Sequence, residues 1–224
     1  MRPGGGRLYP FLKRVLDVAV SLALIGLTAP LWALIALGIK LESPGPVIFR
    51  QRRVGLRGRE FDMYKFRSMV VGADPGPHEE AFRRHAEGKP LDRDAHAPLY
   101  KSSADRRITK VGRFLRATNV DELPQLINVL KGEMSIVGPR PPIQYELRYY
   151  KEWYHHRFEV LQGITGLWQI RARNRVSLEE MVRLDLEYVE RRGLLLDLWL
   201  MLMTGPSMLI QPRRGAPAGK EDEG

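Results

Sequence analysis

The chain has 224 residues, with 36 lysines and arginines against 26 aspartates and glutamates, and it contains no cysteine. The length suits one globular domain with an appendage, and a formal net charge of +10 favours polyanionic partners such as phosphorylated substrates, nucleic acid or an anionic membrane face. The absence of cysteine excludes disulfides, thiolate metal sites and a cysteine nucleophile.

Residues 15–39 form an almost continuous apolar run, long enough to cross a hydrocarbon core of about 30 Å as a straight helix. Pro30, near the middle of the run, removes a backbone hydrogen bond, and Asp17 is costly in a membrane except near the interface. Basic residues flank both ends, so the positive-inside rule favours neither orientation of a simple span. We therefore expect a re-entrant helix–break–helix hairpin over residues 15–40, broken at Ala29 and Pro30, with both ends cytoplasmic.

Two short strands are expected next, at residues 47–51 and in the alternating stretch 60–69, on either side of a basic, glycine-punctuated segment. Lys65 lies in the second strand, where the alternation allows it to project beside a cleft. A solvated lysine on an edge strand is the alternative interpretation. Residues 72–104 are polar and without a clear period, which predicts a loop containing at most one short helix, at residues 79–86.

A further helix is expected to begin near residue 119. Thr118 or Asn119 is a suitable N-cap, Pro124 falls in the first turn, where its missing N–H costs little, and Gly132 is a suitable stop. The residues that follow, Gly-Pro-Arg-Pro-Pro at 138–142, predict a stiff loop.

Asp121 and Glu122 would lie at the start of this helix, where amide donors and the positive end of the helix dipole favour anions. Arg116 comes just before them, and Arg140 is held between two prolines. Carboxylates beside an anion site need a cation. Mg²⁺, bound through a carboxylate and phosphate oxygens, meets that need and indicates phosphoryl chemistry. An ordinary capping box is the alternative interpretation of the acidic pair.

The C-terminal third is expected to be helical. Aromatic residues within a helical region at about 144–161 are typical of a membrane–water interface and fit a core face equally well. Ser177, with Glu180 as its capping-box partner, is expected to begin an amphipathic helix that continues to Arg192. Residues 194–210 suit a helix lying in the membrane interface.

Together these elements predict an α+β, mostly helical chain in four parts. They are a basic N-terminal segment (1–14), the re-entrant membrane hairpin (15–40), a cytoplasmic catalytic domain with interfacial amphipathic helices (41–210) and a disordered tail (211–224).

Four sequences, KRVLDVAVSLALIGLTAPL, VIFRQRRVGLRGREFDMYKFRSM, RITKVGRFLRATNVDELPQLINVLKGEMSIVGPRPP and GITGLWQI, occur in this order between residues 13 and 210. In these motifs the chain resembles the bacterial sugar transferases, the monotopic phosphoglycosyl transferases, in their small form that consists of the catalytic core. The resemblance implies transfer of a sugar 1-phosphate from a UDP-sugar to a polyprenyl phosphate such as undecaprenyl phosphate, with release of UMP, as the first step of glycan assembly on lipid. It also implies the cytoplasmic face of the bacterial inner membrane as the location.

The same resemblance assigns roles to residues. Asp121 is implied as the nucleophile on the β-phosphorus, forming a phosphosugar–aspartyl intermediate, with Glu122 beside it and Mg²⁺ bridging Asp121 and the diphosphate. The implied substrate-binding residues are Lys65, Arg116 and Arg140 at the phosphates, with Gln169 and Arg173 as further candidates near the nucleotide. Direct transfer, with both acids as metal ligands, is the competing mechanism. One departure from the family pattern is that Ala29 stands where Ser often precedes the proline of the helix break.

Two other classes of function are weighed against this one. The net charge of +10 fits a membrane-tethered nucleic-acid binder, but no nucleic-acid-binding module is evident and an unmetalled acidic pair repels a phosphate strand, so no nucleic-acid partner is expected. A non-catalytic membrane scaffold of the same fold is the other alternative. The identity of the sugar and the existence of a homodimer stay open.

Overall fold

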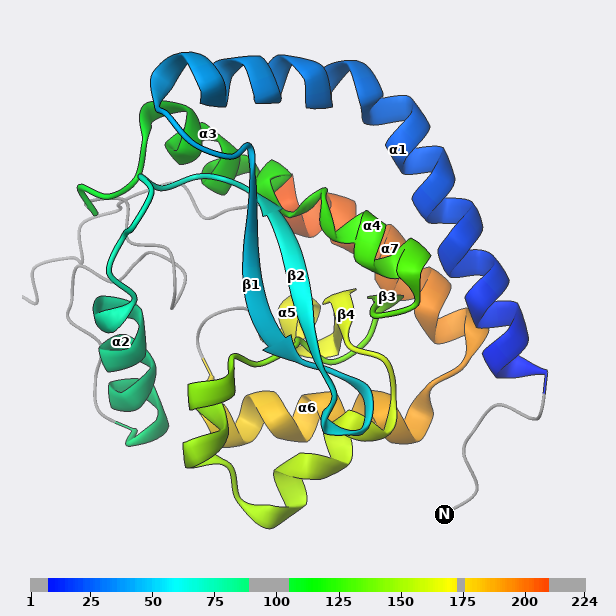
Figure 1. The fold of residues 1–224 in the computed structure, drawn as a ribbon. Coiled ribbons are helices and arrows are strands. Elements are labelled where there is room, and N and C mark those ends of the chain that lie inside the picture. The colour runs from blue at the N-terminus through cyan, green and yellow to red at the C-terminus, as the bar shows by residue number, and fades with distance from the viewer. Residues whose placement is uncertain (1–7, 89–104, 173–175, 210–224) are drawn as a thin grey trace, which may run out of the picture.

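The computed structural model describes residues 8–88, 105–172 and 176–209. Over these residues the chain is mostly helical with two short two-stranded sheets, so the expected α+β class is confirmed at this level (Figure 1). The elements in chain order are α1 (Tyr9–Glu42), β1 (Ile48–Val54), η1 (Leu56–Gly58), β2 (Glu60–Phe66), α2 (Gly76–Ala86), α3 (Lys110–Thr118), η2 (Val120–Glu122), α4 (Gln125–Lys131), β3 (Ser135–Val137), η3 (Gln144–Tyr149), η4 (Glu152–Glu159), β4 (Gly163–Thr165), α5 (Leu167–Arg171), α6 (Leu178–Arg191) and α7 (Leu194–Leu209), where η marks a 3₁₀ helix. The expected tail at 211–224 and the first seven residues of the basic segment lie outside the described residues.

α1 is one continuous helix of 34 residues that contains Pro30. It bends midway, and its two arms run in different directions around the rest of the molecule (Figure 1). Proline removes a backbone hydrogen bond of the helix. In addition, the Thr28 hydroxyl donates to the Leu24 carbonyl oxygen at 2.6 Å and accepts from Trp32 Nε1 at 3.0 Å, an arrangement that often bends helices. A hydroxyl therefore bonds the helix backbone one residue before Ala29, at the Leu24 carbonyl.

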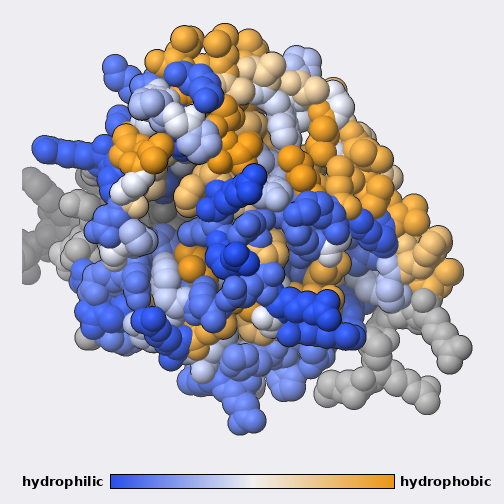
Figure 2. All heavy atoms as spheres, in the orientation of Figure 1, coloured by the Kyte–Doolittle hydropathy of each residue, from blue (hydrophilic) through white to orange (hydrophobic). Residues whose placement is uncertain are grey.

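Much of α1 presents apolar side chains to the outside. Few residues of its most apolar stretch are buried, and it is the one helix of the described residues that is long and apolar enough to cross a membrane. Its exposed large side chains include Leu22, Leu27, Leu31, Leu34, Leu37 and Leu41. Figure 2 shows this apolar surface along the outer edge of the molecule. Such a surface indicates contact with a membrane, because soluble proteins rarely expose apolar patches of this kind.

Both arms of α1 pack against the globular part of the chain. On the N-terminal arm, Asp17 is 1% exposed and its Oδ1 accepts from the Ile136 N–H at 3.1 Å, so this carboxylate faces the protein. On the C-terminal arm, Ile35 and Ile39 form a buried cluster with Phe66 of β2 and Leu115 of α3. The globular part therefore contacts the helix on both sides of its bend.

A buried polar network joins α1 to the C-terminal helices. The Asp197 carboxylate on α7 is fully buried; it pairs with Lys13 Nζ at 3.0 Å and accepts from Tyr9 at 2.9 Å and from Tyr188 of α6 at 2.7 Å. The other side of α7 exposes Leu195, Leu198, Trp199 and Leu202. α7 is thus held to the protein by a charged residue and leaves an apolar face outward.

The two expected strands form an antiparallel hairpin, in which Ile48 lies opposite Phe66 and Val54 opposite Glu60. Phe61 and Met63 of β2 point inward and pack with Val129 of α4 in the main core. β3 and β4 form a separate parallel pair, and the loop at 138–142 follows β3 directly.

The aromatic segment after this loop is not the single helix expected at 144–161. It forms two 3₁₀ helices, η3 and η4, separated by extended backbone at Tyr150 and Lys151. Its aromatic side chains pack with Phe82 of α2 and with Leu178 and Val182 of α6 in a second core cluster, so the core interpretation of these residues holds. The cap of α6 is confirmed, since the Ser177 hydroxyl accepts from the Glu180 N–H at 3.2 Å.

Candidate active site

The acidic pair lies in a 3₁₀ turn between two helices, and the expectation of a helix N-terminus capped by Thr118 or Asn119 is wrong. α3 continues to Thr118, whose hydroxyl donates back to the Phe114 carbonyl at 2.9 Å. Asn119 then takes a left-handed conformation with φ of 56° and caps nothing with its side chain. Asparagine tolerates this conformation better than most residues, so the chain turns here and presents Asp121 and Glu122 on η2. The predicted stop at Gly132 is confirmed by its φ of 79°.

Glu122 pairs with Lys65 across the gap between η2 and β2. Lys65 Nζ lies 3.1 Å from Glu122 Oε1, and both side chains are roughly one-fifth exposed, at 21% and 23%. Asp121, by contrast, is 4% exposed. The structure therefore brings three of the sequence-predicted residues together, with one carboxylate deep and the other at the surface beside a lysine.

Arg116, a fourth sequence-predicted residue, lies on α3 and interacts electrostatically with both Asp121 and Glu122. Burial lowers the pKa of Arg116, and the negative charges of Asp121 and, more weakly, Glu122 act in the opposite direction. An arginine stays charged under these conditions, so Arg116 supplies positive charge to the acidic turn.

Arg140 belongs to a buried cluster that the sequence did not reveal. Its guanidinium lies 3.1 Å from the carboxylate of Glu146, which is fully buried, and Arg53 approaches the same carboxylate at 3.8 Å. Arg53 also donates to the Pro141 carbonyl at 2.9 Å and so braces the proline loop. Burial would raise the pKa of Glu146, but Arg140 and Arg53 outweigh that effect and hold it below its usual value.

The Arg140 cluster and the acidic pair act on each other electrostatically. Burial and then the charge of Arg140 lower the pKa of Arg53 to about 10, while Glu122 opposes that shift. His78 of α2 contacts the Tyr145 hydroxyl. The pKa of His78 is lowered to about 4, first by burial and then by the charge of Arg140, with Arg53 and Lys65 contributing. The site thus combines Lys65, Arg53, Arg116 and Arg140 with three carboxylates, giving a net positive surrounding for Asp121 and Glu122.

One predicted site residue has its described contact elsewhere: Gln169 donates to the Ile164 carbonyl oxygen at 3.2 Å, a bond that holds the turn between β4 and α5. The other, Arg173, lies outside the described residues. Arg53, His78 and Glu146 were missed by sequence reasoning; for Arg53 the only signal was its place in the basic stretch after the strand expected at residues 47–51, a stretch whose first residues belong to β1 in the structure.

The donor set at the turn offers carboxylate oxygens, which suit a hard divalent cation. Among the described residues, no group of three or more histidines, aspartates or glutamates is placed to hold an ion, which excludes an all-protein cage there. Mg²⁺ typically takes one or two carboxylates and completes its shell with substrate phosphates and water. Asp121 with Glu122 beside it fits that pattern.

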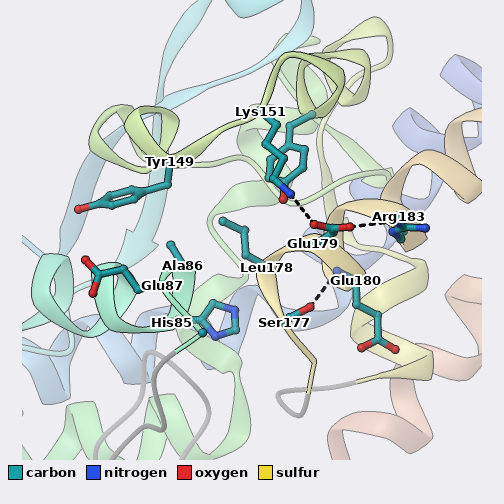
Figure 3. Close-up of a pocket in the computed structure, with 12 residues that line it drawn as sticks. His85, Ala86, Glu87, Tyr149, Lys151, Ser177, Leu178, Glu179, Glu180 and Arg183 are labelled. Atoms are coloured by element: carbon teal, nitrogen blue, oxygen red, sulfur yellow. Dashed lines mark hydrogen bonds and ion pairs between the residues drawn. The ribbon is translucent and has the colours of Figure 1, made fainter.

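A cavity of about 490 Å³ lies elsewhere, between the end of α2, the 3₁₀ segments and the start of α6 (Figure 3). Glu179, on its wall, pairs with Lys151 at 2.6 Å and with Arg183 at 2.8 Å. None of the predicted site residues lines this cavity.

The outward apolar helix and the two adjacent carboxylates among lysine and arginine side chains define a membrane-associated protein with a charged site. The chain belongs to the bacterial sugar transferase family, whose model matches residues 8–211.

Several relatives are similar over most of this chain. One is the UDP-glucose:undecaprenyl-phosphate glucose-1-phosphate transferase of Caulobacter vibrioides, 41% identical over 93% of this chain and 75% of the relative. Another is the undecaprenyl-phosphate galactose phosphotransferase of Salmonella typhimurium, 39% identical over 89% of this chain but only 40% of the relative. The exopolysaccharide production protein ExoY of Sinorhizobium fredii is 37% identical over 94% of this chain and 89% of its own length.

Proposed function

We propose that this chain transfers a sugar 1-phosphate from a UDP-sugar to undecaprenyl phosphate and releases UMP, an initiating step in glycan or exopolysaccharide assembly. The observation that carries the proposal is the buried Asp121 beside the Glu122–Lys65 pair, surrounded by arginines, in a chain whose relatives bear the names of such transferases. A diphosphate and a lipid phosphate are both polyanions, and arginine and lysine are the residues that bind them.

The proposed reaction has two steps. In the first, an Asp121 carboxylate oxygen attacks the β-phosphorus of the UDP-sugar; the bond from that phosphorus to the bridging oxygen breaks, and UMP leaves with the electron pair. In the second, a phosphate oxygen of undecaprenyl phosphate attacks the same phosphorus, and the bond to Asp121 breaks, which restores the carboxylate and leaves a sugar diphosphate on the lipid. Covalent catalysis of this kind lets one site serve two large substrates in turn.

The surrounding cations give the attack its electrostatic basis. A carboxylate and a diphosphate repel each other, so positive charge has to be in place before they approach. Arg116 and Lys65 flank the acidic turn, and Arg140 is fixed by Glu146 and by the neighbouring prolines. Asp121, with Glu122 beside it, would hold Mg²⁺, and the ion when bound would neutralise charge on the diphosphate and the leaving group. Because Asp121 is 4% exposed, few water molecules compete with a seated substrate.

Trapping the first step tests this mechanism. We expect the enzyme, given UDP-sugar and Mg²⁺ without lipid, to release UMP in a burst of at most about one equivalent and to gain the mass of a sugar phosphate. Asp121→Asn should abolish both signals, and Glu122→Gln should cut turnover severely. Asp62→Asn is the control, because Asp62 pairs with Arg52 at 3.3 Å on the exposed side of β2 and should leave the adduct intact. An unmodified mass in protein that turns over once lipid is added would favour direct transfer.

The proposal includes a re-entrant placement of α1 with the globular part on the cytoplasmic face. At about 1.5 Å per residue α1 is roughly 50 Å long, longer than a hydrocarbon core of about 30 Å. The support is that both arms contact the same globular part, through Asp17 on one and Ile39 on the other. A helix that crossed the bilayer would place its two ends in different compartments.

A further inference from the structure

Within the part of the chain that the structure describes, the strand that carries Lys65 has one edge to which no other strand is paired. Among those residues β2 pairs with β1 in a two-stranded sheet, and an isolated hairpin of this kind has little stability of its own. The ladder to β1 sets the register of β2 within the hairpin, and Phe61 and Met63 pack β2 against the core through apolar contacts, which are non-directional. A directional contact on the other edge can tie β2 to the helix packed beside it.

Asn128 of α4 supplies this contact. Its Oδ1 accepts from the Tyr64 N–H at 3.0 Å, and its Nδ2 donates to the Asp62 carbonyl oxygen at 2.7 Å. These two backbone groups, on residues two apart, point to the same edge of a strand. The side-chain amide therefore pairs with β2 as the peptide group of a third strand would.

The Asn128 amide is itself held in place. It is 0% exposed, and its Nδ2 also donates to Glu133 Oε2 at 2.7 Å. The carboxylate accepts only from the NH₂ group, so it fixes which end of the amide faces Tyr64 and which faces Asp62. A buried amide with satisfied donors and acceptor is a rigid contact, and its loss would leave polar backbone groups without partners.

We propose that Asn128 is a positioning residue that sets the distance between Lys65 and the acidic turn. Lys65 directly follows Tyr64 on β2, and α4 directly follows the turn bearing Asp121 and Glu122. The amide thus joins the two elements that carry the Lys65–Glu122 contact of 3.1 Å. The effect of Asn128 on the rate rests on the proposed function, whereas its effect on the position of β2 rests on geometry alone.

A double-mutant cycle measures the coupling. Asn128→Ala should lower kcat for UMP release by up to about 10²-fold, the loss that a displacement near 1 Å can cause. Lys65→Met should lower kcat as well. The double variant should have a kcat little below that of Lys65→Met alone, because Asn128 acts through Lys65. Losses that simply multiply would overturn the inference, since a residue that only stabilises the fold acts independently of Lys65.

Stability and backbone readouts separate the remaining outcomes. Ser177→Ala, which removes the cap of α6, should lower the melting temperature without lowering kcat. Hydrogen exchange at the Tyr64 amide should accelerate in Asn128→Ala while amides paired between β1 and β2 keep their protection; an unchanged Tyr64 rate would refute the contact even if the wild type releases no UMP. If Asn128→Ala does not fold, the double-mutant cycle is measured with Asn128→Asp combined with Glu133→Gln. This pair keeps an acceptor for the Tyr64 N–H, and the glutamine amide donates to the new carboxylate, while the donor to the Asp62 carbonyl is lost.

Discussion

His78 should make the protein sensitive to mild acid. In the folded chain its pKa is about 4, lowered from 6.5 by burial and by the cations Arg140, Arg53 and Lys65, with Glu146 opposing them. A folded-state pKa below the unfolded value means that the unfolded chain takes up the proton first as pH falls. The contribution of His78 to the free energy of unfolding is therefore complete above about pH 6.5 and is lost progressively as pH falls toward 4.

The size of this effect follows from the two pKa values. Between pH 7.5 and pH 5 the His78 contribution to the free energy of unfolding should fall by about 2 kcal/mol. Thermal unfolding followed by tryptophan fluorescence, in one detergent at a series of pH values, measures the slope for the wild type and for His78→Phe, which keeps an aromatic ring against Tyr145. The variant should have the shallower slope, with a residual part from His85, whose pKa burial also lowers. Parallel profiles would show that His78 is not held neutral by its surroundings.

Two further outcomes are expected. Gly163→Ala should destabilise the fold by about 1–3 kcal/mol or more, because its added Cβ would lie 2.1 Å from the backbone N of Gly138. Gly26 has open space around it, so Gly26→Ala is the control. Equal melting temperatures for the two variants would contradict the close approach. Tags at Met1 and Gly224 should both be accessible only from the cytoplasm, and Pro30→Leu should straighten α1 toward a true span; periplasmic labelling of the wild-type N-terminus would rule out the re-entrant placement.

Local patterns in the sequence predicted local structure well. The alternation of residues 60–69 predicted a strand, which the structure has at Glu60–Phe66, and the Ser177–Glu180 spacing predicted the start of α6. The apolar run predicted helix over residues 15–40 with a break at Ala29 and Pro30, where the structure has one continuous helix, α1. The turn at Asn119 was missed because its neighbours also satisfy the rules for a helix cap, and only the path of the whole chain selects the left-handed conformation. The Arg53–Glu146–Arg140 cluster was missed for a different reason: its members come from β1, η3 and the loop between β3 and η3, and no short-range period relates them.

The contacts of α1 decide what can be removed from this enzyme. Deleting the first 42 residues would take away the carboxylate that satisfies the Ile136 N–H, the lysine that neutralises Asp197 and the isoleucines that cover Phe66 and Leu115. A buried acid would lose its counter-ion and a hydrophobic cluster would meet water, each a severe loss. Trimming α1 to obtain a soluble fragment for crystallisation or screening should therefore yield aggregated protein. A soluble form would have to keep the helix and replace only its outward leucines with polar residues.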